Sequence, residues 1–353
     1  MTSYSTFCSL PFRKLKVHPN GDVNMCCYQK GILGNLFEQN VSDIWHGFLA
    51  KEIRQSTLDS NLHTVCKGWG ACPFLNIPLE PKCFSADKEF PSSIEFDLPN
   101  THCNIGGLSP TPESACFMCP RSSPLFRPEP DHSLEIAGHL KCLMPRLSEL
   151  RVQGTAEPFW KGRIFEILER LEFERYQDTC TFSTYTNGTI FGKHERRQFS
   201  ALCPRAAIFF SVDASTPETY IKIRRLNVFS RVVDNIGNFI AERGKTQRVD
   251  IANNLNLLNI DEAVRMVELA SDLGVDGVQF NPTHDGGEAR EDFRHLRVGP
   301  ENYERFDEAE RNIRVRAQEL GIKVFFVRPL GLDFAEHGSW SRPEKPVLLR
   351  AGK

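Results

Sequence analysis

The strongest indication of the fold is a strand pattern, Ser93-Ile-Glu-Phe-Asp-Leu98, followed by the loop Cys103-Asn-Ile-Gly-Gly-Leu-Ser-Pro-Thr-Pro-Glu-Ser-Ala-Cys116-Phe-Met-Cys119-Pro-Arg121. Three cysteines therefore share one loop directly after a strand. Structural zinc usually takes four closed ligands in two close pairs, whereas this loop has one close pair and one distant partner. A [4Fe–4S] cluster on three thiolates keeps one iron open for a cofactor. We therefore favour a cluster here, with a zinc loop or buried packing thiols as the alternatives.

From Ser93 onward, strand and helix patterns alternate along the chain, as they do in parallel sheets with right-handed crossovers. The expected strands after the first are Glu149–Gln153, Thr179–Thr186, Ala206–Val212, Val249–Leu255, Gly277–Asn281 and Lys323–Val327. The expected helices include Arg163–Arg175, Phe229–Arg243, Ile260–Leu273 and Tyr303–Leu320. The pattern predicts an α/β fold, a partial (β/α)6 TIM-like barrel, whose chemistry gathers at the carboxyl ends of the strands.

Composition narrows the class of protein. The 353 residues carry a formal charge of −2 without a Lys/Arg block, which argues against a nucleic-acid partner. No apolar run reaches the length of a membrane span, and the first sixteen residues have no secretory h-region. We therefore expect a cytoplasmic protein without a membrane partner. Structural disulfides are rare there, and the twelve cysteines crowd the amino-terminal part, with none after residue 203, so metal binding is the better interpretation.

Residues 1–90 contain many turns and cysteines and are predicted to form a small separate domain. Strands Lys14–Val17 and Val23–Cys26 flank a turn at His18-Pro-Asn-Gly-Asp. An amphipathic helix is expected over Ser42–Arg54, with Ser42 as its N-cap. Its expected apolar face consists of Ile44, Trp45, Phe48 and Ile53.

The cysteine loop and four later strand ends resemble the radical S-adenosylmethionine (SAM) superfamily. Cys116-Phe-Met-Cys119-Pro-Arg is similar to the second half of the family signature, although twelve residues separate Cys103 from Cys116, so that Ser109–Ala115 reads as an insertion. The four strand-end segments that extend the resemblance are Gln153-Gly-Thr-Ala-Glu157-Pro158, Thr184-Tyr-Thr186-Asn187-Gly188, Phe210-Ser211-Val-Asp213-Ala-Ser215 with the downstream Arg224, and Gly274–Asn281.

The resemblance implies a set of cofactor contacts. Cys103, Cys116 and Cys119 would hold the SAM-binding [4Fe–4S] cluster. Met118 would pack near adenine, Ser211 and Asp213 would address the ribose, and Arg224 would pair with the SAM carboxylate as a bidentate donor. The remaining implied SAM contacts are Gly154, Thr155, Glu157 and Asn187, with Glu157 in its ordinary ionised state at pH 7.

The amino-terminal segment has a resemblance of its own. Gly21-Asp-Val-Asn-Met-Cys26 followed by later cysteines resembles SPASM and twitch domains. The resemblance implies an auxiliary [4Fe–4S] cluster, here ahead of the barrel, on Cys8, Cys26, Cys66 and Cys72, with Cys27 and Cys83 as substitutes. A structural zinc knuckle on the same thiols is the competing interpretation. The implied domains are a twitch-like domain at 1–90, a radical SAM barrel at 91–328 and a tail or lid at 329–353.

The resemblance implies reductive cleavage of SAM to a 5′-deoxyadenosyl radical, which takes hydrogen from a small polar substrate or a peptide. The auxiliary cluster would accept an electron, so the net reaction would be an oxidation, and a flavodoxin or ferredoxin would supply the reductant. Two alternatives stay open. One is a redox-neutral epimerase in which Cys180, or else Cys142 or Cys203, returns a hydrogen atom. The other is a zinc-stabilised binding protein without catalysis.

Overall fold

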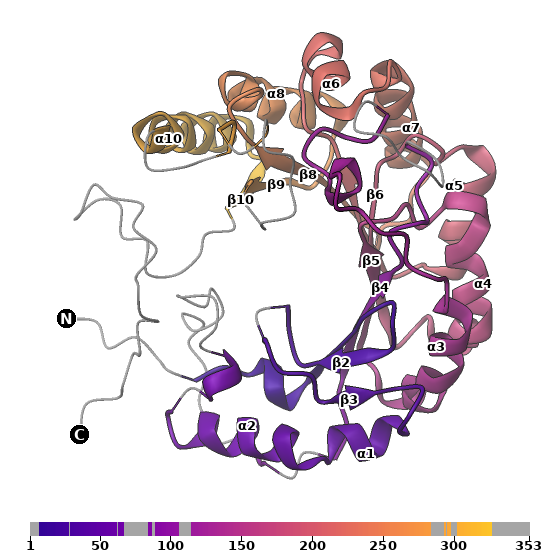
Figure 1. Cartoon of the computed structure of the whole chain (residues 1–353). Coiled ribbons are helices and arrows are strands. Elements are labelled where there is room, and N and C mark those ends of the chain that lie inside the picture. Colours follow the sequence, from indigo (N-terminus) through magenta and orange to yellow (C-terminus); the bar gives the residue numbers. More distant parts are fainter. Residues whose placement is uncertain are drawn as a thin grey trace.

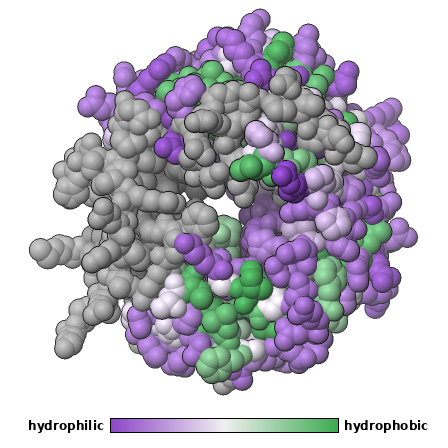
Figure 2. All heavy atoms as spheres, in the orientation of Figure 1, coloured by the Kyte–Doolittle hydropathy of each residue, from purple (hydrophilic) through white to green (hydrophobic). Residues whose placement is uncertain are grey.

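The computed structural model describes residues 7–27, 29–61, 63–66, 84–86, 89–105, 114–283, 293, 295–297 and 302–326. Its strands form one ten-stranded sheet in the order β10-β9-β8-β7-β6-β5-β4-β1-β2-β3. The sheet curves into an open barrel with the helices outside it, and its two edges face each other across the gap (Figure 1). The side of the molecule drawn in Figure 2 is mostly hydrophilic where it is coloured. None of the helices in the described ranges is long and apolar enough to cross a membrane.

The barrel part confirms the expected fold class. Neighbouring strands from β4 to β10 are all parallel. The strands are β4 (Ser93–Leu98), β5 (Glu149–Gly154), β6 (Thr181–Thr186), β7 (Ala206–Ser211), β8 (Arg248–Leu255), β9 (Gly277–Pro282) and β10 (Lys323–Phe326). The helices are α3 (Ser133–Leu140), α4 (Arg163–Arg170), α5 (Lys193–Leu202), α6 (Pro217–Arg224), α7 (Phe229–Glu242), α8 (Ala263–Leu273) and α10 (Tyr303–Leu320).

Short 3₁₀ turns account for most of the boundary differences from the sequence analysis. The helix expected over Arg163–Arg175 ends at Arg170 and is followed by a separate turn at Phe173–Tyr176. The helix expected from Ile260 starts as a turn at Ile260–Glu262 before α8 begins. The other 3₁₀ turns are Leu10–Phe12, Thr64–Cys66, Pro120–Ser122, Lys141–Arg146 and Trp160–Gly162.

Alternation along the strands separates the core from the barrel interior, because successive side chains point to opposite faces of a sheet. One face packs under the helices in an aromatic core, in which Phe191 contacts Phe199, Phe210 and Phe239 at ring distances of 5.2–5.9 Å. The opposite face carries polar side chains into the interior. For example, Arg151 Nε of β5 donates to Ser183 Oγ of β6 at 3.0 Å.

The amino-terminal strand extends the barrel sheet across the expected domain boundary at residue 90. The strands β1 (Lys14–Val17), β2 (Asp22–Asn24) and β3 (Gly34–Asn35) form an antiparallel unit. Strand β1 also pairs in parallel with β4, in the register Lys14 to Ser93 through Val17 to Phe96. The residues expected to form a separate domain therefore contribute directly to the barrel wall.

Buried charges hold β1 to the barrel. Lys16 Nζ donates to Glu95 Oε1 at 2.7 Å and contacts Asp97 Oδ2 at 2.5 Å, and Lys14 pairs with Glu95 Oε2. Gln153 of β5 also donates to Glu95 Oε1, at 2.8 Å. Burial opposes ionisation of Glu95, but Lys16 and Lys14 outweigh it and lower the pKa of Glu95 to about 2. The ion pairs between β1 and β4, which we call the seam, are therefore charged in the folded protein at neutral pH.

The helix expected over Ser42–Arg54 is wrong in detail, because the chain forms two helices, α1 (Val41–Trp45) and α2 (Phe48–Leu58). Asn40, not Ser42, is the N-cap of α1, since its Oδ1 accepts from the amide of Asp43 at 2.9 Å. Gly47 sits in extended backbone and caps α2, which suits its poor helix propensity. The break turns Phe48 outward, so it is 78% exposed and not part of the expected apolar face.

Candidate functional site

The cysteine loop lies at the carboxyl end of β4, where sequence analysis placed it. Cys103 follows β4, and the amide of Cys119 donates to the carbonyl of Cys116 at 3.0 Å. The amide of Phe117 donates to the carbonyl of Ile223 at 2.8 Å, which ties the close pair to the end of α6. Part of the expected insertion, residues 109–113, lies outside the described residues, and Ala115 is buried.

The three thiols form one electrostatic group. Burial raises the pKa of Cys103 to about 12 and that of Cys119 to about 11, and the nearby Cys116 adds to both shifts. Burial raises the pKa of Cys116 as well. Such thiols stay protonated at pH 7 and need a bound cation to become thiolates. Among the described residues, no three His, Cys, Asp or Glu side chains come close enough to hold one metal ion. A cubane differs from a single ion because each thiolate binds a different iron.

A buried ion pair adjoins the cysteine pair. Arg224, the last residue of α6, contacts Asp213 Oδ2 at 2.5 Å and donates to the carbonyl of Ser211 at 2.9 Å. Its Nη1 lies 3.9 Å from Cys116 Sγ. Burial opposes the charge on Arg224, but Asp213 and Cys116 outweigh it and raise the arginine pKa. The structure thus pairs Asp213 and Arg224 with each other, whereas the sequence resemblance assigns them to separate parts of a cofactor.

Glu157 differs from its expected ordinary ionised state. It is fully buried, and burial raises its pKa to about 7 despite three donors to its carboxyl group. Thr186 Oγ1 and the amide of Phe159 donate to Oε1 at 2.7 and 3.2 Å, and the amide of Asn187 donates to Oε2 at 2.6 Å. The side chain therefore clamps the end of β5 to the end of β6. A motif cannot reveal this shift, because the burial comes from the surrounding fold.

Asn104 is a contact that sequence analysis missed. Asn187 Nδ2 donates to Asn104 Oδ1 at 2.9 Å, and Asn104 Nδ2 donates to Thr189 Oγ1 at 2.7 Å. These bonds connect the residue after Cys103 to the end of β6, so Asn187 is brought to the cysteine loop. The only signal in the sequence was a polar residue adjacent to a candidate ligand.

A cavity of about 510 Å³ opens beside these residues in the barrel interior. Gly154, Thr155 and Ser211, three of the expected cofactor contacts, are on its wall together with residues from the amino-terminal hairpin, such as Lys16 and His18. The rest of the wall is formed by Pro19, Asp97, Leu98, Asn100, Pro120, Arg121, Phe126, Glu129, Gln153 and Tyr185. Met118 is half-buried in the loop between the paired cysteines.

The backbone at Gly154 explains why a glycine stands there. Its φ is +131°, and a Cβ at this position would come within 2.7 Å of the Leu98 carbonyl oxygen. Only glycine allows this close approach of β5 to β4 without strain. The approach sets the floor of the cavity.

The spare cysteines lie elsewhere. Cys180 precedes β6 at its amino end, opposite the cysteine loop, and is fully buried, with burial raising its pKa to about 12. Cys203 is also buried, and Cys142 is exposed.

The expected auxiliary ligands are only partly described. Cys8 is buried and Cys26 and Cys66 are half-buried, while Cys72 and Cys83 lie outside the described residues. Met25, next to Cys26, shares a small core with Ala50 and Ile53, against which Cys66 packs. The fold thus brings the neighbourhoods of Cys26 and Cys66 together. Cys27 is exposed.

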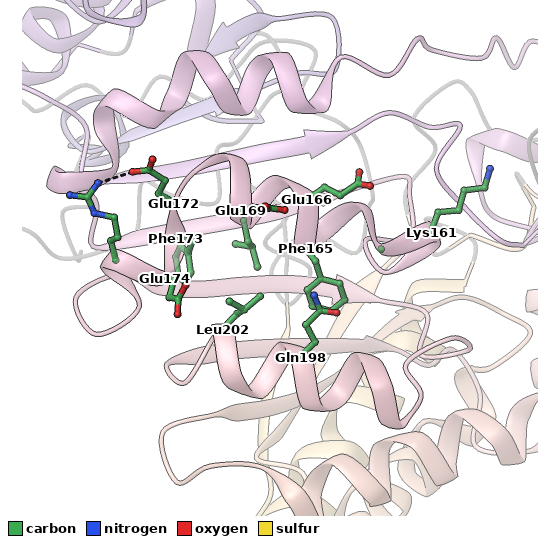
Figure 3. A pocket seen from close by; sticks show the side chains of 12 residues that line it. Lys161, Phe165, Glu166, Glu169, Glu172, Phe173, Glu174, Gln198 and Leu202 are labelled. Atoms are coloured by element: carbon green, nitrogen blue, oxygen red, sulfur yellow. Dashed lines mark hydrogen bonds and ion pairs between the residues drawn. The ribbon is translucent and has the colours of Figure 1, made fainter.

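A larger cavity, about 710 Å³, lies on the outer side of the barrel and has a different character. Figure 3 shows its wall, formed largely by α4, the turn after it and α5, with acidic side chains such as Glu166 and Glu169. Its wall contains none of the cysteines of the loop. The candidate site is therefore the carboxyl edge of the barrel and not this outer groove.

The amino-terminal part is similar to a known domain family. Residues 8–73 match the SPASM family, described as an iron–sulfur cluster-binding domain. No curated protein matches the chain. Among solved structures, the chain resembles Streptococcus suis SuiB bound to precursor peptide SuiA, at 13% identity and a TM-score of 0.51, over 83% of this chain and 64% of that one.

A histidine-tagged form of anSMEcpe with bound AdoMet gives 16% identity and a TM-score of 0.52, over 67% of this chain and 61% of that one. A radical SAM methyltransferase from Sphaerobacter thermophilus gives 15% identity and a TM-score of 0.46, over 65% of this chain and 64% of that one. The chain spans less than two thirds of the length of each of these proteins. At these identities, the likeness to the SuiB and anSMEcpe structures shows a shared fold.

Proposed function

We propose that this chain, which carries a SPASM domain at residues 8–73 and the barrel fold of radical SAM enzymes, cleaves SAM reductively and abstracts hydrogen from a polar substrate. The observation that carries the proposal is the position of Cys103, Cys116 and Cys119 on the loop after β4, at the carboxyl edge of the barrel, with Cys116 close enough to raise the pKa of both other thiols. That edge is where barrel enzymes place their chemistry.

The donor set fits an iron–sulfur cluster. Three soft thiol ligands stand in a largely buried place, and Arg224 lies 3.9 Å from Cys116 Sγ, where its charge favours the thiolate. Thiolate ligands select zinc or iron–sulfur clusters among biological metals. When bound, such a cluster supplies the electron that breaks the carbon–sulfur bond of SAM and yields the 5′-deoxyadenosyl radical.

The residues around the cluster site divide the work of holding SAM. Gly154, Thr155 and Ser211 line the cavity and would contact SAM directly, joined by Met118 and Asn187 from the adjoining loops. The carboxyl and guanidinium groups of the expected contacts Glu157, Asp213 and Arg224 are already engaged within the protein. We propose that these three hold the strand ends and Cys116 in place.

The cavity favours a polar substrate. Lysine, aspartate, arginine and glutamate side chains all line it, so the wall is polar and contains both signs of charge. It reaches from the proposed SAM contacts to Lys16 and His18 of the amino-terminal hairpin. A small polar molecule or a short peptide segment suits such a wall. SuiB, which shares the fold, was solved with a precursor peptide.

We propose oxidation as the net reaction. An auxiliary [4Fe–4S] cluster on Cys8, Cys26, Cys66 and Cys72 would take the electron that remains on the substrate, and a flavodoxin or ferredoxin would reduce the SAM-binding cluster. Cys180 does not suit the redox-neutral alternative, because it is fully buried at the amino end of β6, far along the strand from the cysteine loop.

Iron and sulfide quantification after anaerobic reconstitution, joined to a SAM-cleavage assay, tests the function. We expect about eight irons per chain and 5′-deoxyadenosine on addition of SAM and dithionite. Cys116→Ala with Cys119→Ala should abolish 5′-deoxyadenosine and remove about half of the iron, while the control Cys142→Ala changes neither. A colourless protein that binds zinc and leaves SAM intact would replace this proposal with the non-catalytic alternative.

Solvent deuterium separates oxidation from epimerisation once a substrate is found. An epimerase places one deuteron on carbon in its product, and an oxidation places none there. Loss of deuterium incorporation in Cys180→Ser would assign the hydrogen donor to Cys180 against our expectation.

A further inference from the structure

A buried hydroxyl group near Cys116 has no assigned role. Tyr220 lies on α6, one turn before Arg224, and is 0% exposed. Within the described ranges its hydroxyl group has no hydrogen-bond partner. A buried hydroxyl group without a partner costs about 1–3 kcal/mol, and such groups are rare in native proteins. The orphaned group therefore points to a partner other than the residues that the structure describes.

The residues around the hydroxyl group restrict which acceptors could be its partner. Burial raises the pKa of Tyr220 to about 12, and Arg224, Cys116, Asp213 and Glu157 are all close enough to influence it. The ring is held in place by Phe229, whose ring centre lies 5.5 Å away. Tyr220 is therefore packed in place within electrostatic reach of the charged group around the cysteine loop.

The acceptors in that group differ in availability. Asp213 Oδ2 is held in the ion pair with Arg224, although it accepts no hydrogen bond from a described residue, and Oδ1 accepts from the amide of Asn254. Both oxygens of Glu157 accept hydrogen bonds from residues at the end of β6, directly after it, or in the loop after β5. Cys116 is different, since its thiol now donates toward the carbonyl of Arg224 at 3.9 Å. Sulfur bound to iron as a thiolate has no proton to donate and becomes an acceptor only.

We propose that Tyr220 is a positioning residue that donates a hydrogen bond to the Cys116 thiolate when this residue ligates the cluster, alongside Arg224. The inference rests on the proposed function, because it needs a cluster on Cys116. Hydrogen bonds to ligand sulfurs are among the factors that set cluster potentials. A donor to the sulfur disperses its negative charge and favours the reduced cluster, so Tyr220 raises the reduction potential of the SAM-binding cluster.

Redox titration of the reconstituted full chain, followed by EPR, tests the inference with Tyr220→Phe. The SAM-binding cluster is identified as the signal that changes when SAM is added. At a fixed applied potential we expect the ratio of reduced to oxidised cluster to fall about tenfold, which corresponds to ~59 mV for one electron. Iron content should stay at the wild-type value. The matched control is Tyr176→Phe, in the turn before β6 at the far end of the barrel, which should leave the titration unchanged.

Replacement of Tyr220 by 3-fluorotyrosine covers the case in which the phenylalanine variant does not fold or load iron. Fluorine makes the phenol a stronger donor without removing it, so the potential should rise. An unchanged titration in a correctly loaded Tyr220→Phe protein, or in the fluorotyrosine protein, overturns the inference. A wild-type chain without any SAM-responsive cluster signal instead overturns the proposed function, so the two failures are distinguishable.

Discussion

Replacing Glu95 by Gln should weaken the seam between β1 and β4. Glu95 binds both lysines of β1, and its side chain is only 5% exposed. The two lysines lower the pKa of Glu95 from 4.5 to about 2. One pKa unit corresponds to about 1.36 kcal/mol, so this shift contributes about 3 kcal/mol to the folding free energy. Glutamine keeps the shape and loses the charge. Removing one partner of a buried pair in other proteins costs a similar amount, about 3–5 kcal/mol.

The sign of the pH dependence follows from linkage. A carboxyl group whose pKa is lowered by folding stabilises the protein above its unfolded pKa, and this contribution is lost as the pH falls toward the folded value. The advantage of wild type over Glu95→Gln should therefore be about 3 kcal/mol at pH 7 and shrink to about 1.4 kcal/mol at pH 3.

Urea denaturation of the apo chain at both pH values measures the difference. The control is Glu169→Gln, since Glu169 is exposed on α4, and this variant should fall within about 0.5 kcal/mol of wild type. Equal losses in the two variants, or a loss for Glu95→Gln that does not shrink on acidification, would refute the charged seam.

Two further substitutions test the walls of the site. Gly154→Ala forces a Cβ to within 2.7 Å of the Leu98 carbonyl oxygen and should lower the free energy of unfolding by more than about 2 kcal/mol. The control Gly162→Ala, with φ at +71° and open space around it, should lower it by about 1–2 kcal/mol. Thermal denaturation compares the two variants. Arg224→Met leaves Asp213 charged and unpaired in the interior and should destabilise the apo chain by about 3–5 kcal/mol. Adding Asp213→Asn should recover most of that loss in the same assay, and no recovery would contradict the paired arrangement.

The regular elements were predictable where local pattern and tertiary packing agree. Strand β4 and helix α10 have the expected bounds, because their alternating and helical periodicities persist in the fold. The two helices within residues 40–58 were not predictable, because a single capping side chain and one glycine divide one apolar pattern into two helices. Differences of this size depend on individual hydrogen bonds that a periodicity does not contain.

In the candidate site, too, some features could be predicted from the sequence and others could not. The order of the motifs along the chain indicated which strand ends would meet, and Cys103, Cys116 and Asn187 lie at those ends. The raised pKa of Glu157 could not be predicted, because it depends on complete burial by residues distant in sequence. Pairing of β1 with β4 was equally hidden, since residues about eighty positions apart form that ladder.

That ladder has a consequence for biosynthesis. A ribosome adds about 5–20 residues per second, so strand β1 precedes its parallel partner β4 by roughly 4–16 s of elongation. During this interval the nascent hairpin keeps an open edge, and unpaired edges invite aggregation. The yield of folded chain therefore depends on how much of the nascent hairpin stays unpaired until β4 emerges.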